Sequence, residues 1–349
     1  MAYEKRSSII MSKKKGVSVK FIAEKCGVST ATVSRVLNDD NKVAEDTRKL
    51  VLEAFETYQY QPPERLNFHQ KKIGVIINVN TEDYYASLLQ EITKYMLKWD
   101  YITISCSLSR EQISLKTALE VLYSSEVSGI IMIGNEYERI KPYLQKSIAH
   151  VWIDCNDELP ATKEICTVQS DHYTAGRLAA QALLGQKRTK PLLLTNARNS
   201  VRNRERTNGF FQVFKEAGIL LHSENVVMLD ANKDGFTEAQ AYIRYAIAKG
   251  MDFDSLFVIS DWRALGAYTG AVSMGKRVPE DICIIGFDGI SLACKCVNIT
   301  CIHQDTEKMA QRACEQLHTL MEGNPVEEKH VIIPTDLLPG QTLSHLSGI

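Results

Sequence analysis

Residues 17–62 read VSVKFIAEKCGVSTATVSRVLNDDNKVAEDTRKLVLEAFETYQYQP, and the spacing of their apolar residues predicts three short helices joined by turns. Ser18 is placed to cap the first helix, and Gly27 follows its end, where glycine allows a left-handed turn. Ser29 then caps a second helix over residues 30–38, and a third helix begins a few residues later. Three such helices in so short a stretch are typical of a helix-turn-helix module that reads DNA.

The second predicted helix has one apolar face and one small polar face. Val33 and Val36 fall on the side that packs inward. The other side carries small or hydroxyl side chains and one arginine, namely Thr30, Ala31, Ser34 and Arg35. A face of this kind suits a DNA groove better than it suits the apolar partner of a protein-binding helical domain.

The formal net charge of −1 over 349 residues hides an uneven distribution. Residues 1–72 hold 14 Lys and Arg against 9 Asp and Glu, whereas residues 73–349 hold 27 against 33. A small basic block, suited to phosphate contacts, is therefore joined to a larger acidic body. The composition, 44% hydrophobic and 24% charged, excludes a disordered or fibrous protein, and no apolar run is long enough for a membrane helix.

The string Gly27-Val28-Ser29-x-x-Thr32-Val33-Ser34-Arg35-Val36-Leu37-Asn38 resembles the recognition-helix signature of the lactose/galactose repressor family of bacterial transcription regulators. Tyr60-x-Pro62 resembles the junction into the hinge of that family, and the resemblance runs from about Val17 to the end of the chain. It implies a fold class of a small all-α helix-turn-helix domain followed by a two-lobed α/β body. That body is like a type I periplasmic binding protein and is built on parallel sheets.

The resemblance also implies roles for the matching residues. Thr30 and Ala31 would meet base edges in the major groove, and Arg35 would reach a guanine with its two-donor fork. Three hydroxyl residues would mostly hold phosphates, and they are Ser29, Thr32 and Ser34.

The expected hinge over residues 60–72 departs from the family pattern. The family usually carries Pro-Asn and then a short Ala-Arg-x-Leu helix whose leucine enters the minor groove, but here His69 takes the leucine position. Leu66, or Phe68 in a shifted register, would be the apolar wedge if the hinge helix forms. An ordinary flexible linker is the alternative, and the residues favour the two interpretations equally.

From residue 73 on, short apolar runs such as IGVIINV and SLFVIS alternate with helical stretches. This alternation predicts parallel sheets covered on both faces, and the number of strands predicts two lobes with a cleft between them. From the resemblance, the chain is expected to cross between the lobes near residues 170, 302 and 330. The expected boundaries are a helix-turn-helix domain at 1–59 with order from about 17, a hinge at 60–72, an N-lobe at about 73–170 plus 303–330, and a C-lobe at about 171–302 plus 331–349.

Effector-binding residues are expected in the cleft where strands end and helices begin. Tyr84 and Tyr85 follow the first strand and suit stacking on a ring, although paired tyrosines at a helix start are as often packing residues. The resemblance assigns effector contacts to Arg206 and to Asp261, which follows SLFVIS and would otherwise cap the next helix. Asp171 lies at the first crossover and is expected to border the site.

Other charged residues of these segments are expected to play no direct part. Arg202 and Arg204 are predicted to be solvated, and Asp288, at the exit of the strand in DICIIGFDGI, is predicted to be structural and near the cleft rim. One arginine and one aspartate in a cleft suit a neutral polyhydroxyl ligand, so the expected effector is a sugar.

Motifs for catalysis and metal binding are missing from the sequence. There is no G-x-G-x-x-G after the first strand, no P-loop and no H-E-x-x-H or G-x-S-x-G motif. Nine scattered cysteines indicate a reducing compartment, and the C-x-C at Cys294 and Cys296 does not have zinc-finger spacing. We therefore expect no enzyme activity, no cofactor and no metal.

The combined interpretation is a bacterial, cytoplasmic transcriptional regulator, most simply a repressor. Its expected partners are near-palindromic double-stranded operator DNA, a small-molecule effector and a second copy in a homodimer, with no membrane. A dimer is favoured over a tetramer because the chain stops soon after its last strand. The alternatives are a solute-binding protein without a DNA function and an α/β enzyme with a DNA-binding appendage.

Overall fold

The chain forms two compact units, Met1–His69 and Gln70–Ile349, in the computed structural model. The structure describes residues 17–37, 43–60, 71–78, 83–108, 114–157, 165–196, 200–230, 233–289 and 296–344. Among these residues, no helix combines the length and the apolar character needed to cross a membrane.

The first unit is a three-helix module, as its sequence predicts, and its helices are α1 (Val19–Cys26), α2 (Thr30–Leu37) and α3 (Glu45–Thr57). The Ser18 hydroxyl accepts a hydrogen bond from the Phe21 backbone N–H at 3.2 Å, which caps α1. Gly27 ends α1 in the left-handed region with a φ of 66°. The Ser29 hydroxyl accepts from the Thr32 N–H at 3.1 Å and so caps α2.

A small apolar core holds these helices together, with Ile22, Val33 and Val51 each fully buried. Each of the three comes from a different helix, so the core fixes α2 relative to α1 and α3. Phe21, beside this core, is 36% exposed and packs edge-on against Tyr58 with ring centroids 5.2 Å apart.

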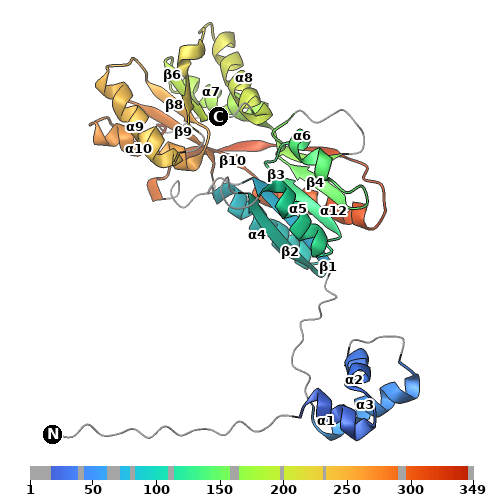
Figure 1. Cartoon of the computed structure of the whole chain (residues 1–349). Helices are drawn as coiled ribbons and strands as arrows, with labels where there is room; N and C mark the ends of the chain where they lie inside the picture. The colour runs from blue at the N-terminus through green and yellow to red at the C-terminus, as the bar shows by residue number, and fades with distance from the viewer. Residues whose placement is uncertain are drawn as a thin grey trace, which may run out of the picture. The chain divides into compact units, whose positions relative to one another are not determined.

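The second unit contains two lobes, each built on a six-stranded sheet (Figure 1). The N-lobe sheet has the order β11-β5-β4-β3-β1-β2, and every pair in it is parallel. Its strands are β1 (Lys71–Asn78), β2 (Tyr101–Leu108), β3 (Gly129–Ile133), β4 (Ala149–Ile153), β5 (Cys166–Ser170) and β11 (His330–Ile333). Its helices are α4 (Asp83–Leu97), α5 (Leu115–Ser124), the single turn α6 (Tyr137–Ile140) and α12 (Thr306–Met321).

The C-lobe sheet has the order β12-β10-β9-β8-β6-β7, and only the edge pair of β12 with β10 is antiparallel. Its strands are β6 (Pro191–Asn196), β7 (Val226–Leu229), β8 (Ser255–Val258), β9 (Cys283–Asp288), β10 (Thr300–Gln304) and β12 (Thr335–Leu338). Its helices are α7 (His172–Gly185), α8 (Val201–Glu216), α9 (Gly235–Ala248) and α10 (Asp261–Ser273). The inner strands of both sheets are apolar and mostly buried because helices cover both faces of a parallel sheet, whereas the edge strands are only partly buried.

The chain crosses between the lobes at Asp171, Asp305 and Pro334, since these residues separate elements of different sheets. The second and third crossings lie a few residues later than the predicted positions near 302 and 330. β10 stays in the C-lobe sheet through Gln304, and β11 stays in the N-lobe sheet through Ile333. Figure 1 shows the consequence, because α12, late in the chain, lies among the early elements of the N-lobe.

The strand β12 was not predicted separately. It has four residues, and one residue, Pro334, separates it from β11. Only their pairing, with β5 in one sheet and with β10 in the other, shows that they belong to different lobes.

Candidate functional site

The predicted DNA-reading face lies on the exposed side of α2. Thr30, Ala31 and Arg35 are exposed, while Val33 and Val36 on the opposite side are buried in the three-helix core. The inward and outward sides therefore follow the prediction from the helical spacing.

The three hydroxyl residues predicted to hold phosphates lie at the start and on the flank of α2. Ser29 is exposed, whereas Thr32 and Ser34 are half-buried. The Ser29 and Thr32 hydroxyls lie 2.9 Å apart and share a hydrogen bond, so this pair orders the beginning of the helix. The proposed wedge residue Leu66 lies outside the described residues.

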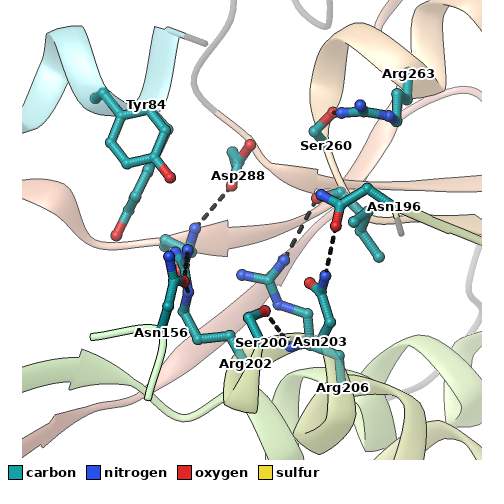
Figure 2. A pocket seen from close by; sticks show the side chains of 13 residues that line it. Tyr84, Asn156, Asn196, Ser200, Arg202, Asn203, Arg206, Ser260, Arg263 and Asp288 are labelled. Atoms are coloured by element: carbon teal, nitrogen blue, oxygen red, sulfur yellow. Dashed lines mark hydrogen bonds between the residues drawn. The ribbon is translucent and has the colours of Figure 1, made fainter. Parts of the chain in front are cut away.

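A pocket opens between the two lobes of the second unit, and Figure 2 shows its side chains. The N-lobe contributes α4 and Asn156, which follows β4, and the C-lobe contributes α8, α10 and the ends of several strands. The lining residues are Tyr84, Tyr85, Asn156, Asn196, Ser200, Arg202, Asn203, Arg206, Ile259, Ser260, Arg263, Asp288 and Gln304. Apart from Ile259 and the two tyrosine rings, the lining side chains are polar.

Of the five predicted effector residues, the structure brings Tyr84, Tyr85 and Arg206 together at this pocket. Tyr84 and Tyr85 are both largely buried on α4, with ring centroids 5.4 Å apart. Arg206 comes from α8, across the pocket from Tyr84 (Figure 2).

Asp171 does not line the pocket. Its carboxylate accepts a hydrogen bond from the Thr174 N–H at 2.8 Å and caps α7. Asp305 caps α12 in the same way at the second crossing, bonding the Lys308 N–H at 2.9 Å. The two crossover aspartates thus start the helices that follow each change of lobe.

Asp261 does not line the pocket either, and the pocket carboxylate is that of Asp288. Asp261 is the first residue of α10 rather than its cap, and its carboxylate accepts from the Gly289 N–H at 3.1 Å. Asp288 has a φ of 96° at the end of β9 and accepts a 2.7 Å hydrogen bond from Gln304. A non-glycine residue in this backbone region is strained, and such strain is often found at binding sites.

Arg202 lines the pocket and is not solvated, so its prediction was wrong. Its side chain is 14% exposed and donates to the Asn156 side-chain oxygen at 2.6 Å and to Asp154 at 3.4 Å. Arg202 and Arg206 are four residues apart, so a helix places both on one face. This spacing was the sequence feature that could have indicated a shared site. No feature of the sequence marked the other polar residues of the pocket, which include Arg263, Asn156 and the remaining amide side chains of the wall.

Behind the pocket, the fully buried carboxylate of Asp154 collects donors from both lobes. Tyr84 donates to it at 2.6 Å from the N-lobe, while His172 at 3.2 Å and Arg202 at 3.4 Å reach it from the C-lobe. Burial raises the pKa of Asp154, but His172, Arg202 and the Tyr84 hydroxyl outweigh it and hold the pKa well below its usual range. The carboxylate is therefore an ionised link between the lobes.

His172 joins this carboxylate to Arg206. Burial, followed by the charge of Arg206, lowers the pKa of His172 to about 4, so the ring is neutral at pH 7. The neutral ring donates from Nε2 to Asp154 and accepts at Nδ1 from the Arg206 Nε–H at 3.3 Å. Arg206 also lies 3.6 Å from the ring centroid of Phe287, which orients its guanidinium.

Two glycines allow α7 and α8 to pack closely enough to place these side chains. A Cβ on Gly176 would overlap the Arg206 carbonyl, and one on Gly209 would overlap the Tyr173 carbonyl. Because the two helices lie so close together, the start of α7, where His172 lies, is beside the arginines of α8.

Two family descriptions match the chain, one to each unit. "Bacterial regulatory proteins, lacI family" matches residues 18–63, and "Periplasmic binding protein-like domain" matches residues 180–343.

Curated relatives match nearly the whole chain. The HTH-type transcriptional repressor PurR of Mannheimia succiniciproducens is 25% identical over 92% of this chain and 97% of that protein. The ribose operon repressor of Halalkalibacterium halodurans is 28% identical over 93% of this chain and 96% of that protein.

Solved structures show the same fold. A lac repressor dimer bound to operator and the anti-inducer ONPF is 22% identical, with a TM-score of 0.74 over 94% of this chain and 99% of that chain. The transcriptional regulator CelR in complex with cellobiose is 21% identical, with a TM-score of 0.70 over 93% of this chain and 99% of that chain.

Proposed function

The chain belongs to the LacI family of bacterial regulatory proteins, which are DNA-binding repressors and not enzymes, and from this premise we propose how it works. A homodimer binds a near-palindromic operator through the exposed face of α2. A sugar bound in the pocket between the lobes changes the affinity for that operator.

The main support for DNA binding is the exposed side of α2, which carries small side chains and one arginine. The two short side chains of Thr30 and Ala31 let the helix approach base edges, and Arg35 lies one turn further on. Two copies of the module in a dimer would place two recognition helices in successive major grooves. The lac repressor dimer bound to operator has the same fold as this chain.

Control by an effector is supported by the composition of the pocket walls. Tyr84 belongs to the N-lobe and Arg206 to the C-lobe, so a ligand that contacts both stabilises one arrangement of the lobes. A ligand changes the affinity for the operator only if it binds the DNA-binding and non-binding states of the protein with different affinities. Operator binding measured with and without the ligand shows whether the ligand weakens or strengthens DNA binding.

A sugar is supported by the chemistry of the pocket wall. Asn156, Asn196, Asn203, Gln304 and Asp288 offer the amide and carboxylate groups that bind hydroxyls, with two tyrosines beside them. Two solved structures of the same fold contain cellobiose and D-xylulofuranose.

The test begins by selecting binding sites from random double-stranded DNA with the full-length protein. We expect a near-palindromic site, measured by fluorescence anisotropy at fixed salt against scrambled DNA. Arg35→Ala is expected to lose about 1–3 kcal/mol of preference for the selected site over scrambled DNA. Failure to select any site, or full preference in Arg35→Ala, contradicts the proposed docking.

A sugar panel added to the operator complex then tests the effector part. We expect at least one sugar to shift operator affinity, and Asp288→Ala to abolish the shift while the ligand-free affinity is unchanged. A shift that survives in Asp288→Ala would place the effector elsewhere.

A further inference from the structure

The buried ring of His172 lies between a carboxylate of one lobe and a pocket residue of the other. His172 is the first residue of α7, directly after the crossing at Asp171, and it is only 1% exposed. Its Nε2 lies 3.2 Å from the carboxylate of Asp154, in the N-lobe, and its Nδ1 lies 3.3 Å from the Nε of Arg206, in the C-lobe. The ring therefore joins the two lobes through its two nitrogens.

The two partners of His172 allow only one position for the ring proton. The Nε–H of an arginine can only donate, and an ionised carboxylate can only accept. A proton on Nε2 satisfies both Asp154 and Arg206, whereas a proton on Nδ1 would leave two N–H groups facing each other. The contacts thus fix both the orientation of the ring and its neutral form, in agreement with its pKa of about 4.

The hydrogen bond to His172 also orients the guanidinium of Arg206. That guanidinium lies 3.6 Å from the ring centroid of Phe287 and donates from Nη1 to the Ile259 carbonyl at 3.4 Å. With the Nε–H bonded to His172, the plane of the guanidinium cannot rotate without losing this bond. The Nη groups at the end of the side chain are then the donors that can reach a ligand in the pocket, where Figure 2 shows Arg206 among the lining residues.

The series of contacts continues from Asp154 back to the pocket. The Tyr84 hydroxyl donates to the second carboxylate oxygen of Asp154 at 2.6 Å, and Tyr84 lines the pocket from the N-lobe. We call Tyr84, Asp154, His172 and Arg206 the buried chain. Its two inner members are exposed by 1% each, while its two ends line the pocket from different lobes. A ligand that contacts both ends therefore closes a ring with the buried chain.

We propose that His172 is a positioning residue for the effector response. It holds Arg206 in the orientation that binds the effector, and it links the position of this arginine to Asp154 of the N-lobe. The arrangement of the lobes in which the buried chain is intact is then the arrangement that binds the effector most tightly. This inference rests on the proposed effector function and adds the residue through which a contact at Arg206 affects the other lobe.

The first test measures sugar binding to the full-length protein by calorimetry, with D-ribose, D-xylulose and cellobiose as probes. His172→Leu removes both ring nitrogens and is expected to weaken the binding of a sugar by about tenfold or more. His172→Gln, whose amide both donates and accepts, should recover most of this affinity. His150→Leu makes the same exchange on β4, outside the pocket lining, and should change nothing.

Operator anisotropy at saturating sugar separates positioning from a merely structural role. The change in operator affinity caused by the sugar should be smaller in His172→Leu than in the unaltered protein, and restored in His172→Gln. Lower stability alone would leave the change at saturation intact. A sugar that binds His172→Leu with full affinity and shifts its operator affinity fully would keep the proposed function and overturn the role of His172.

A double-mutant cycle tests whether His172 acts through Arg206. Arg206→Lys keeps the positive charge but removes the Nε–H that His172 accepts. In this background His172→Leu should weaken sugar binding by less than about threefold. An equal loss in both backgrounds would show that His172 does not act through Arg206, and would overturn the inference.

The position of the ring proton gives a test that needs no ligand. Nitrogen NMR of the histidine-labelled protein at pH 7 should show the His172 proton on Nε2, with the signal assigned by its absence in His172→Gln. A proton on Nδ1 overturns the inference whichever sugar binds. If no sugar of the panel binds, the sugar part of the proposed function is contradicted, and the position of this proton decides the inference by itself.

Discussion

Replacing Arg202 with methionine tests whether the buried bridge between the lobes stabilises the body. Met keeps the length of the side chain but removes the donors to Asn156 and Asp154. The Asp154 side chain is fully buried, and removing one partner of a buried ion pair costs about 3–5 kcal/mol. Because Tyr84 and His172 still donate to Asp154, we expect the lower end, about 3 kcal/mol.

The assay is urea unfolding of the second unit, followed by tryptophan fluorescence and by circular dichroism to test whether the transitions coincide. A loss of about 3 kcal/mol corresponds to a fall of roughly 5 °C in the melting midpoint of a body of this size. A double-mutant cycle with Asp154→Asn then isolates the pair, with an expected coupling of about 1–3 kcal/mol.

The control compares Arg202→Met with Arg204→Met, which removes a neighbouring arginine of the same helix that lies outside the pocket lining. A loss below about 1 kcal/mol in Arg202→Met would show that the bridge does not stabilise the body. Strict additivity with Asp154→Asn would contradict the prediction as well, because the two groups would then not interact.

The close packing of α7 on α8 predicts that Gly209→Ala destabilises the body by about 1–3 kcal/mol, because its Cβ would overlap a backbone carbonyl. Gly185→Ala, whose Cβ meets nothing within 4 Å, is the control in the same thermal melts, and equal effects would contradict the packing argument. The lowered pKa of His172 predicts a loss of stability on acidification, since the unfolded ring binds a proton near pH 6.5 and the folded ring only near pH 4. Stability should therefore fall between these values by at most about 1.4 kcal/mol per pH unit, and His172→Gln should flatten the profile measured by urea titration at each pH. An unchanged slope in that variant would assign the acid sensitivity to other groups.

The sequence predicted the local features of the DNA-reading module because they depend on neighbours along the chain. The cap at Ser18, the left-handed Gly27 and the inward side of α2 at Val33 need only contacts three or four residues away. The strand pattern of the body was predicted for the same reason, since an apolar run bounded by turns is a local property.

The composition of the pocket could not be predicted in the same way. Asp261 comes shortly after β8 and Asp288 is the last residue of β9, and the family resemblance assigned the effector contact to Asp261. The backbone of Asp288 has a φ of 96° and its side chain is held by Gln304, so it is the one that lines the pocket. The Asp261 carboxylate instead accepts a hydrogen bond from the Gly289 backbone N–H.

Short-range periodicity and a local motif were therefore sufficient to predict a helix-turn-helix joined to a two-lobed α/β body. Which charges meet depends instead on how distant parts of the chain pack together. Arg202 finds Asp154 from 48 residues away, and the two lie in different lobes. No spacing in the sequence indicates which distant residue a charged side chain will contact. The balance of charge in the pocket therefore follows only from the positions of the two lobes.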